Sequence, residues 1–167
     1  MTDIPLPRAE AEALLFREAL YLDRHEWDAW LALYEPDCEF WMPAWRDEGN
    51  PTSDPDTELS LIYYRGRRNL EDRVWRLRSG TSVASLPLAR TAHAVTNVLV
   101  ERAAETESAV TASFTVHRFD PRAQTSHVFF GRYEYLLRSV GQEWRIARKK
   151  ILLLNDVIPT VLDFYTI

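Results

Sequence analysis

The chain has 167 residues and a formal net charge of −5, with 46% hydrophobic and 27% charged residues. These proportions are typical of a soluble globular protein, and the acidic balance argues against a nucleic-acid-binding surface, which needs clustered basic residues. The single cysteine, Cys38, excludes an intrachain disulfide and predicts a reducing compartment, the cytoplasm. Residues 1–5 lack the basic and apolar regions of a secretory signal, and no apolar run approaches the ~18 residues of a membrane span.

The first third of the chain predicts two helices. From Ala9, apolar residues recur at three- and four-residue steps as far as Leu22, which indicates an amphipathic helix. A second apolar face is formed by Trp27, Trp30, Leu31 and Tyr34, at positions i, i+3, i+4 and i+7. We therefore expect a second short helix that includes Tyr34 and ends at residues 36–37.

The next segment mixes strand, loop and helix patterns. Residues 38–42 predict a first strand, and the Pro- and Asp-rich residues 43–57 predict a loop. Residues 58–64 are apolar and aromatic, which indicates either a strand or an extended entry into a helix. Residues 67–78 place apolar side chains on one helical face, with Gly80 as the stop signal.

The second half of the chain predicts strands. Ala92, Ala94, Thr96, Val98 and Val100 alternate with more polar neighbours, and the same period of two runs through residues 110–116, so each strand is expected to bury one face. Residues 126–138 and 143–154 predict two longer strands joined by a tight turn. Helices first and strands later predict an α+β fold, with the helices packed on one face of a strongly curved, mainly antiparallel sheet.

Metal binding is the first chemistry that the four histidines suggest. If the turn after Asp120 centres near Arg122, His117 and His127 lie opposite each other across a hairpin. No local spacing supplies the carboxylate that a mononuclear iron site adds to two histidines, so the alternative is a pair of polar side chains on a solvated or subunit-facing strand. A Rieske cluster is excluded, because it needs two cysteines and two histidines.

Acid–base catalysis is the second possibility. Asp23, His25 and His93 are the candidate groups for proton transfer in an enclosed cavity. The alternatives are a surface turn for Asp23 and His25 and a buried, hydrogen-bonded imidazole for His93. Cys38 lies among aromatic residues of a strand, where it is expected to be a small buried hydrophobe rather than a nucleophile.

Several ordered segments carry a resemblance to a known family. They are FREA at residues 16–19, DRHEWDAWLALY at 23–34, FWMP at 40–43, SLIYY at 60–64, LEDRV at 70–74, PLARTAH at 87–93 and KKILLLND at 149–156. Each segment is unspecific alone, but the ordered set spans nearly the whole chain. The chain resembles the small (beta) subunits of aromatic-ring-hydroxylating dioxygenases, in the benzoate, toluate and anthranilate branch.

This resemblance implies a single domain over residues 1–167 with the cone-shaped α+β roll of nuclear transport factor 2 and scytalone dehydratase. It implies a structural subunit without cofactors of its own. The large-subunit partner would carry the Rieske 2Fe-2S cluster and the mononuclear iron. Three large and three small subunits would form a hexamer, with the small subunits self-associating as a trimer. A reductase would supply electrons from NADH, and the complex would add O2 to a benzoate-like acid.

Contacts with partner subunits are expected where aromatic and arginine residues gather, because both are enriched at interfaces. The predicted interface residues are Trp41, Trp45, Tyr64, Arg65, Arg68, Arg73, Arg90 and His93. Replacing Arg73 and Arg90 by alanine is predicted to weaken assembly without unfolding the chain. Two other functions stay open: a stand-alone lyase or isomerase that uses a cavity Asp/His pair, and a binding adaptor without an enzyme partner.

Overall fold

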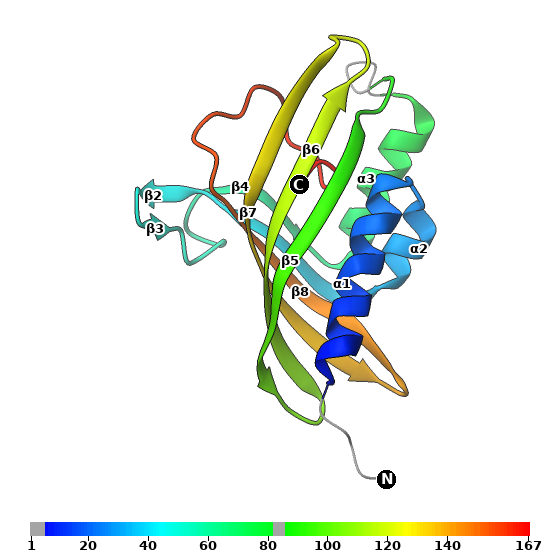
Figure 1. Ribbon diagram of the computed structural model, residues 1–167, viewed down its shortest axis with the longest axis vertical. Coiled ribbons are helices and arrows are strands. Elements are labelled where there is room, and N and C mark those ends of the chain that lie inside the picture. The colour runs from blue at the N-terminus through cyan, green and yellow to red at the C-terminus, as the bar shows by residue number, and fades with distance from the viewer. Residues whose placement is uncertain (1–5, 82–85) are drawn as a thin grey trace.

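The computed structural model describes residues 6–81 and 86–167 (Figure 1); the opening residues 1–5, considered above for a signal sequence, lie outside these ranges. The elements in chain order are α1 (Arg8–Asp23), α2 (Trp27–Ala32), β1 (Tyr34–Pro43), β2 (Trp45–Asp47), β3 (Asn50–Pro51), β4 (Ser60–Arg65), α3 (Arg67–Ser79), β5 (Arg90–Ala103), β6 (Glu107–Asp120), β7 (Thr125–Val140) and β8 (Glu143–Leu153). Among the described helices, none is long and apolar enough to cross a membrane.

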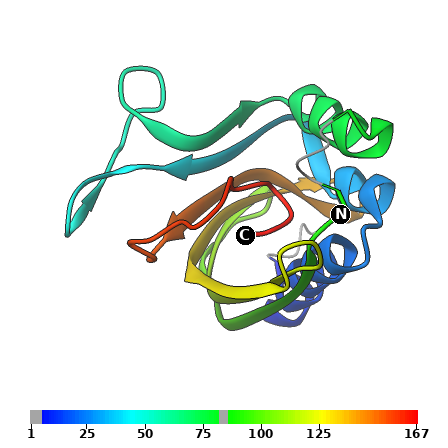
Figure 2. The same cartoon turned by 90° about the horizontal axis from the view of Figure 1, so that it is seen from above.

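Six strands form one curved sheet in the order β4-β1-β8-β7-β6-β5. The last four strands are a continuous antiparallel meander, and β1 joins β8 in parallel and β4 in antiparallel orientation. The three helices gather on one side of this sheet, and the sheet curls around the C-terminal residues (Figures 1 and 2). The structure thus confirms the predicted α+β fold with helices on a strongly curved, mainly antiparallel sheet.

Strand β6 shows why alternation predicts the sheet well. Ser108, Val110, Ala112, Phe114 and Val116 are all buried, and the residues between them are only partly covered. Side chains of a strand point alternately to its two faces, so period two in the sequence becomes one buried face. The predicted strand at residues 110–116 is confirmed and extends further in both directions.

Strand β5 departs from the expected alternation. Ala92, Ala94 and Thr96 are exposed, whereas Val98 is buried, although all were expected on one face. The cause is an irregularity between Thr96 and Leu99, where Asn97 adopts a positive φ of 55°. An extra residue in a strand turns the following side chains to the other face. The prediction of one continuous buried row was therefore wrong for the first half of the strand.

The second helix is shorter than expected. It ends at Ala32, and Tyr34 begins strand β1 instead of completing a helical face. Pro36 follows two residues later, and a proline disfavours helical backbone in the residue before it. The amide of Ile146 donates to the carbonyl of Leu33 at 2.8 Å, which draws the chain into the sheet at this point.

The expected loop at residues 43–57 contains a small hairpin. Strands β2 and β3 pair only with each other, and this hairpin projects away from the main sheet (Figures 1 and 2). Of residues 58–64, the last five belong to strand β4, which begins at Ser60, and none enters a helix. Helix α3 begins and ends close to the predicted bounds, and Gly80 ends it in a left-handed conformation with φ 65°.

The C-terminal segment, residues 163–167, fills the interior of the curved sheet without forming a helix or strand. All five residues are buried, and the Phe164 ring stacks on Trp30 with 4.7 Å between ring centroids. Tyr165 packs edge-on against Trp27 and accepts a hydrogen bond from the amide of Ala89 at 3.2 Å. The core of the fold is therefore completed by the last residues of the sequence.

Candidate functional site

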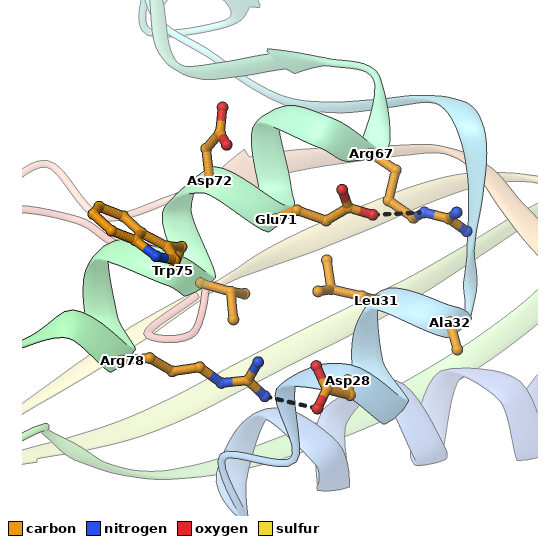
Figure 3. Close-up of a pocket in the computed structure, with 9 residues that line it drawn as sticks. Asp28, Leu31, Ala32, Arg67, Glu71, Asp72, Trp75 and Arg78 are labelled. Carbon is orange, nitrogen blue, oxygen red and sulfur yellow. Dashed lines mark hydrogen bonds and ion pairs between the residues drawn. The ribbon is translucent and has the colours of Figure 1, made fainter.

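Helix α3 presents an exposed aromatic and basic surface. Trp75 is 64% exposed, although tryptophan is the largest side chain and normally loses most of its surface on folding. It lies beside a groove of about 590 Å³ between α2 and α3 (Figure 3). Arg68, seven residues earlier and hence on the same helix face, is exposed and forms no ion pair with any residue of the described ranges.

Two ion pairs border this groove. Arg67 contacts Glu71 at 3.2 Å within α3, and Arg78 reaches across to Asp28 of α2 at 2.9 Å (Figure 3). Both pairs are substantially solvated, so they orient the side chains more than they stabilise the fold. The floor between them is apolar and includes Leu31. The groove combines a hydrophobic floor with charged edges, which is the anatomy of a protein-contact surface.

A second hollow lies where the β2–β3 hairpin meets the end of β8. It measures about 470 Å³, and its apolar lining comes from Ala44, Trp45, Leu61, Leu153, Leu154 and Ile158. Asp47, Glu48 and Asp156 also line it. The indole of Trp45 donates to the carbonyl of Leu153 at 2.8 Å, which fixes the hairpin to β8. This hollow therefore has an apolar floor and an acidic rim.

The predicted aromatic interface residues differ in exposure. Trp41 is buried, and its indole donates to Ser60 at 2.9 Å. Tyr64 and Trp45 are half-buried, and Trp45 lines the acidic hollow. Only Trp45 among these three thus lines a hollow described above.

The predicted arginines are spread over several faces. Arg65 contacts Asp56 at 3.2 Å, and Arg90 lies over the ring of Phe119 at 5.7 Å. Both are exposed, like Arg68. Arg73 instead pairs with Asp163 of the C-terminal segment at 2.9 Å. The structure does not bring the eight predicted residues together into one patch.

Asp23 and His93 form a close pair inside the fold. His93 Nδ1 lies 2.5 Å from an Asp23 carboxylate oxygen, and the His93 amide and the Thr91 hydroxyl donate to the same carboxylate. Burial raises the pKa of Asp23, but the hydrogen bonds from His93 outweigh it and bring the pKa below its ordinary value. His93 Nε2 faces the carbonyl oxygen of Ile167 at 3.3 Å. The His93 side chain is almost fully buried, with its second nitrogen against the C-terminal segment, whereas the Asp23 side chain stays 19% exposed.

His25 and Cys38 do not complete a catalytic arrangement. His25 stacks on Trp27 at 5.0 Å between centroids and lies edge-on to Tyr165 at 5.6 Å, and among the described residues it forms no hydrogen bond with Asp23 or His93. Burial raises the pKa of the Cys38 thiol to about 12, so the reactive thiolate is disfavoured. The geometry therefore gives little support to a stand-alone lyase or isomerase.

A buried charged cluster is the largest feature that the sequence analysis missed. Lys149 Nζ contacts Glu18 at 2.9 Å, and both side chains are almost fully buried. The hydroxyls of Tyr34 and Tyr135 donate to the same carboxylate at 2.5 and 2.6 Å. Burial raises the pKa of Glu18, but attraction to Lys149 and these hydrogen bonds outweigh it, so its pKa lies below the ordinary value. The alternation of β8 places Lys149 on the inner face of the sheet. This position in the alternation was the sequence signal from which its burial could have been predicted.

The proposed pairing of His117 and His127 was wrong. Strands β6 and β7 pair Arg118 with His127 and His117 with Val128, so the two histidines point to opposite faces of the sheet. The turn is shifted because the Asp120 carboxylate accepts hydrogen bonds from the amides of Arg122 and Ala123 at 2.8 and 3.0 Å. Within residues 6–81 and 86–167, no three His, Cys, Asp or Glu side chains gather in a metal-binding group.

Comparison with known proteins identifies the family. A family model described as ring hydroxylating beta subunit matches residues 17–160. The chain belongs to this family of beta subunits. This beta subunit is 42% identical over 166 residues to the 2-halobenzoate 1,2-dioxygenase small subunit of Burkholderia cepacia, with 99% of each chain covered. The resemblance noted in the sequence is thus confirmed.

Solved structures agree with this assignment. The crystal structure of the beta subunit of benzoate 1,2-dioxygenase from Burkholderia mallei superposes on this beta subunit with a TM-score of 0.80, at 35% identity and with all of both chains covered. A scytalone dehydratase-type protein from Novosphingobium aromaticivorans shares the fold at a TM-score of 0.65 and 16% identity, over 87% of this chain and 82% of that one. The expected cone-shaped roll is therefore confirmed.

Proposed function

We propose that this beta subunit is the structural small subunit of a Rieske-type dioxygenase that oxidises a benzoate-like aromatic acid. In this proposal the holoenzyme takes electrons from NADH through a reductase and adds O2 to the ring. The large subunit carries the 2Fe-2S cluster and the mononuclear iron, and three large and three small subunits assemble in the cytoplasm. Residues 1–167 act as one domain.

The observation that carries the proposal is similarity over whole chains. The relative named as a 2-halobenzoate dioxygenase small subunit and the structure named as a benzoate dioxygenase beta subunit both match this chain from end to end. Both names refer to benzoate-type substrates. Similarity of this extent supports the same role in a dioxygenase complex. Because both relatives are named for benzoate-type substrates, we assign a benzoate-like acid as the substrate of the complex.

The donor groups of this chain do not fit the iron cofactors. The one cysteine, Cys38, is buried in β1 with a raised pKa, and a Rieske cluster needs two cysteines. His117 and His127 lie on opposite faces of the sheet, so they cannot hold one iron together. We therefore assign both metal centres to the large subunit and no catalytic step to this chain.

The contribution of this subunit would then be to hold the large subunits in place. Arg65, Arg68 and Arg90 are exposed and offer planar donors for carboxylates of a partner. Trp45 offers an aromatic edge beside the acidic hollow. Two members of the predicted set, Trp41 and the His93 side chain, are buried and would act by positioning the exposed contact residues. Tyr64 and Arg73 are intermediate in exposure.

The test is co-expression with the large subunit of a benzoate-type Rieske dioxygenase, followed by measurement of mass in solution and of benzoate-dependent O2 uptake. We expect a stable complex whose activity and iron are lost when the large subunit is omitted. A chain that stays unassociated, or that binds iron and turns over on its own, would contradict the proposal. Absence of neighbouring genes for a Rieske protein and a reductase would also count against it.

A further inference from the structure

The inner face of the curved sheet carries polar groups that the fold leaves without partners. Arg118 continues the buried face of β6 two residues after Val116, and His127 lies directly opposite Arg118 on β7. The Nε atom of Arg118 and the Nε2 atom of His127 are buried, and neither has a hydrogen-bond partner in the part of the chain that the structure describes. The Nη2 atom of Arg118 lies 3.6 Å from Asp120. Because an unpaired buried polar atom is costly, these groups favour an occupant that brings acceptor oxygens.

His93 lies on the same inner face, on β5. Its Nδ1 atom is 2.5 Å from an Asp23 oxygen, and its Nε2 atom is 3.3 Å from the main-chain oxygen of Ile167. Both partners are acceptors, so an imidazole ring with a hydrogen on each nitrogen satisfies both contacts. Arg118 acts on the same C-terminal segment, because burial raises the pKa of Tyr165 and the Arg118 charge opposes this rise. The sheet therefore presents donors and positive charge to residues 163–167.

The helix side of this interior is aromatic. Trp30 stacks on Phe164 at 4.7 Å between ring centroids, and Trp27 meets Phe164 and Tyr165 edge-on at 5.4 and 5.6 Å. His25 lies edge-on to Tyr165 at 5.6 Å, and its buried Nε2 atom has no hydrogen-bond partner among the described residues. Stacked and edge-on contacts of this kind suit a flat aromatic ring. The interior thus combines surfaces that hold a ring with groups that bind acceptor oxygens.

The C-terminal segment is tied to the rest of the fold by few polar contacts. Across the described ranges these are the 2.9 Å ion pair of Asp163 with Arg73, the 3.2 Å bond from the Ala89 amide to the Tyr165 hydroxyl, and the contact of Ile167 with His93. Its other hydrogen bonds are internal, since Asp163 bonds to Phe164 and Thr166. Residues 154–162, which connect it to β8, form neither helix nor strand and are mostly exposed. The segment can therefore leave the interior as one unit with its own turn intact.

We propose that the interior of the curved sheet is a binding site for an aromatic carboxylic acid, and that residues 163–167 occupy this site in competition with the acid (Figure 2). The ring of the acid replaces the Tyr165 ring against Trp27, and its carboxylate accepts hydrogen bonds from His93 and Arg118. A carboxylate brings two acceptor oxygens, whereas the segment leaves Arg118 Nε unpaired. The site binds the acid and carries out no reaction on it. The choice of a benzoate-like acid rests on the proposed function.

The first experiment measures hydrogen exchange of the full chain with benzoate as the probe and with acetate at the same ionic strength as the control. Benzoate should raise the exchange of residues 163–167 in a saturable manner, because the segment leaves when the acid binds. Acetate has the carboxylate without the ring and should leave the exchange unchanged. Equilibrium dialysis measures the affinity for benzoate directly. Absence of benzoate binding, binding without a change in the segment, or an equal effect of acetate would overturn the proposal.

A substitution that loosens the segment tests the competition. Arg73→Gln removes the ion pair with Asp163, so a larger fraction of chains has an open site and benzoate should bind roughly 3- to 10-fold more tightly. The matched control is Arg76→Gln, three residues later on α3, because Arg76 is exposed and forms no ion pair within the described residues. If Arg73→Gln does not fold, Asp163→Asn removes the same pair from the other side. Equal affinities of the loosened and control variants would refute the competition.

A substitution in the wall tests the recognition of the carboxylate. Arg118→Gln removes a charged donor and should weaken benzoate binding about 10-fold. Its control is Arg90→Gln, because Arg90 lies opposite Phe119 and therefore on the outer face of the same sheet. Circular dichroism checks that both variants are folded. An affinity that Arg118→Gln leaves unchanged, or that both variants lower equally, would contradict the proposed site.

The large subunit separates this inference from the proposed function. A chain that assembles with the large subunit and supports benzoate-dependent O2 uptake, but binds no benzoate when isolated, refutes the inference and leaves the proposed function standing. A chain that binds benzoate with release of residues 163–167, but does not assemble with the large subunit, contradicts the proposed function and leaves the binding site standing.

Discussion

Replacing Lys149 by methionine is expected to destabilise the fold strongly. Methionine preserves the length of the side chain but leaves Glu18 buried without its cation. Breaking a buried ion pair on one side costs about 3–5 kcal/mol of unfolding free energy, because the remaining charge stays desolvated. The hydrogen bonds from Tyr34 and Tyr135 persist and keep the loss within this range. For a chain of this size, the melting temperature should fall by roughly 6–20 °C.

The matched control is Lys150→Met in the next position of the same strand. Lys150 lies on the other sheet face, contacts Glu134 at 3.6 Å and covers the ring of Trp41. Because Glu134 is well solvated, this change should cost no more than about 1 kcal/mol. Urea unfolding at fixed protein concentration measures both variants. Equal effects of the two substitutions, or a loss below about 1 kcal/mol for Lys149→Met, would refute the reasoning.

Three further outcomes follow from the core. Phe164→Ala should cost about 3–5 kcal/mol in urea unfolding, because it empties the space against Trp30; a cost near zero would show that the C-terminal segment is not packed in solution. Gly131→Ala should prevent normal folding, judged by soluble yield and circular dichroism, because a Cβ there overlaps the carbonyl of Leu152. The pKa of Glu18 is lowered in the folded chain, so its contribution is complete above the ordinary carboxyl pKa and is lost as pH falls through the folded value. Glu18→Gln should therefore flatten the acid limb of a stability–pH curve, and an unchanged acid limb would contradict this assignment.

Local patterns predicted most of the elements of the fold. Alternation in residues 110–116 and the stop signal at Gly80 depend on neighbours in sequence, and both were confirmed. The buried face of β5 was not predictable, because a bulge at Asn97 reverses it and nothing in the alternation marks that position. The His117–His127 pairing failed by one residue, since the turn geometry depends on hydrogen bonds of Asp120.

The buried ion pair and the exposed contact residues were less predictable from the sequence than the helices and strands. The pairing of Glu18 with Lys149 joins residues 131 positions apart, and local periodicity carries no information on such distances. The helical period places Trp75 away from the buried face of Leu70, Val74 and Leu77, but only the packing of α3 reveals that 64% of it is exposed. Family resemblance supplied the role of the chain, because exposed contact residues leave no periodic trace in one sequence.

The burial of residues 163–167 has a consequence for how the chain is made. Residues 163–167 are synthesised after all the helices and strands that the structure describes. Trp30, near the start of the sequence, is therefore not covered by Phe164 until these residues have been made. Until then, the inner wall of the sheet is open to solvent, and partly made chains expose apolar surface that favours aggregation. Chains synthesised only as far as β8 should therefore depend on chaperones, and they should acquire their native interior only once residues 163–167 are available to pack against Trp30.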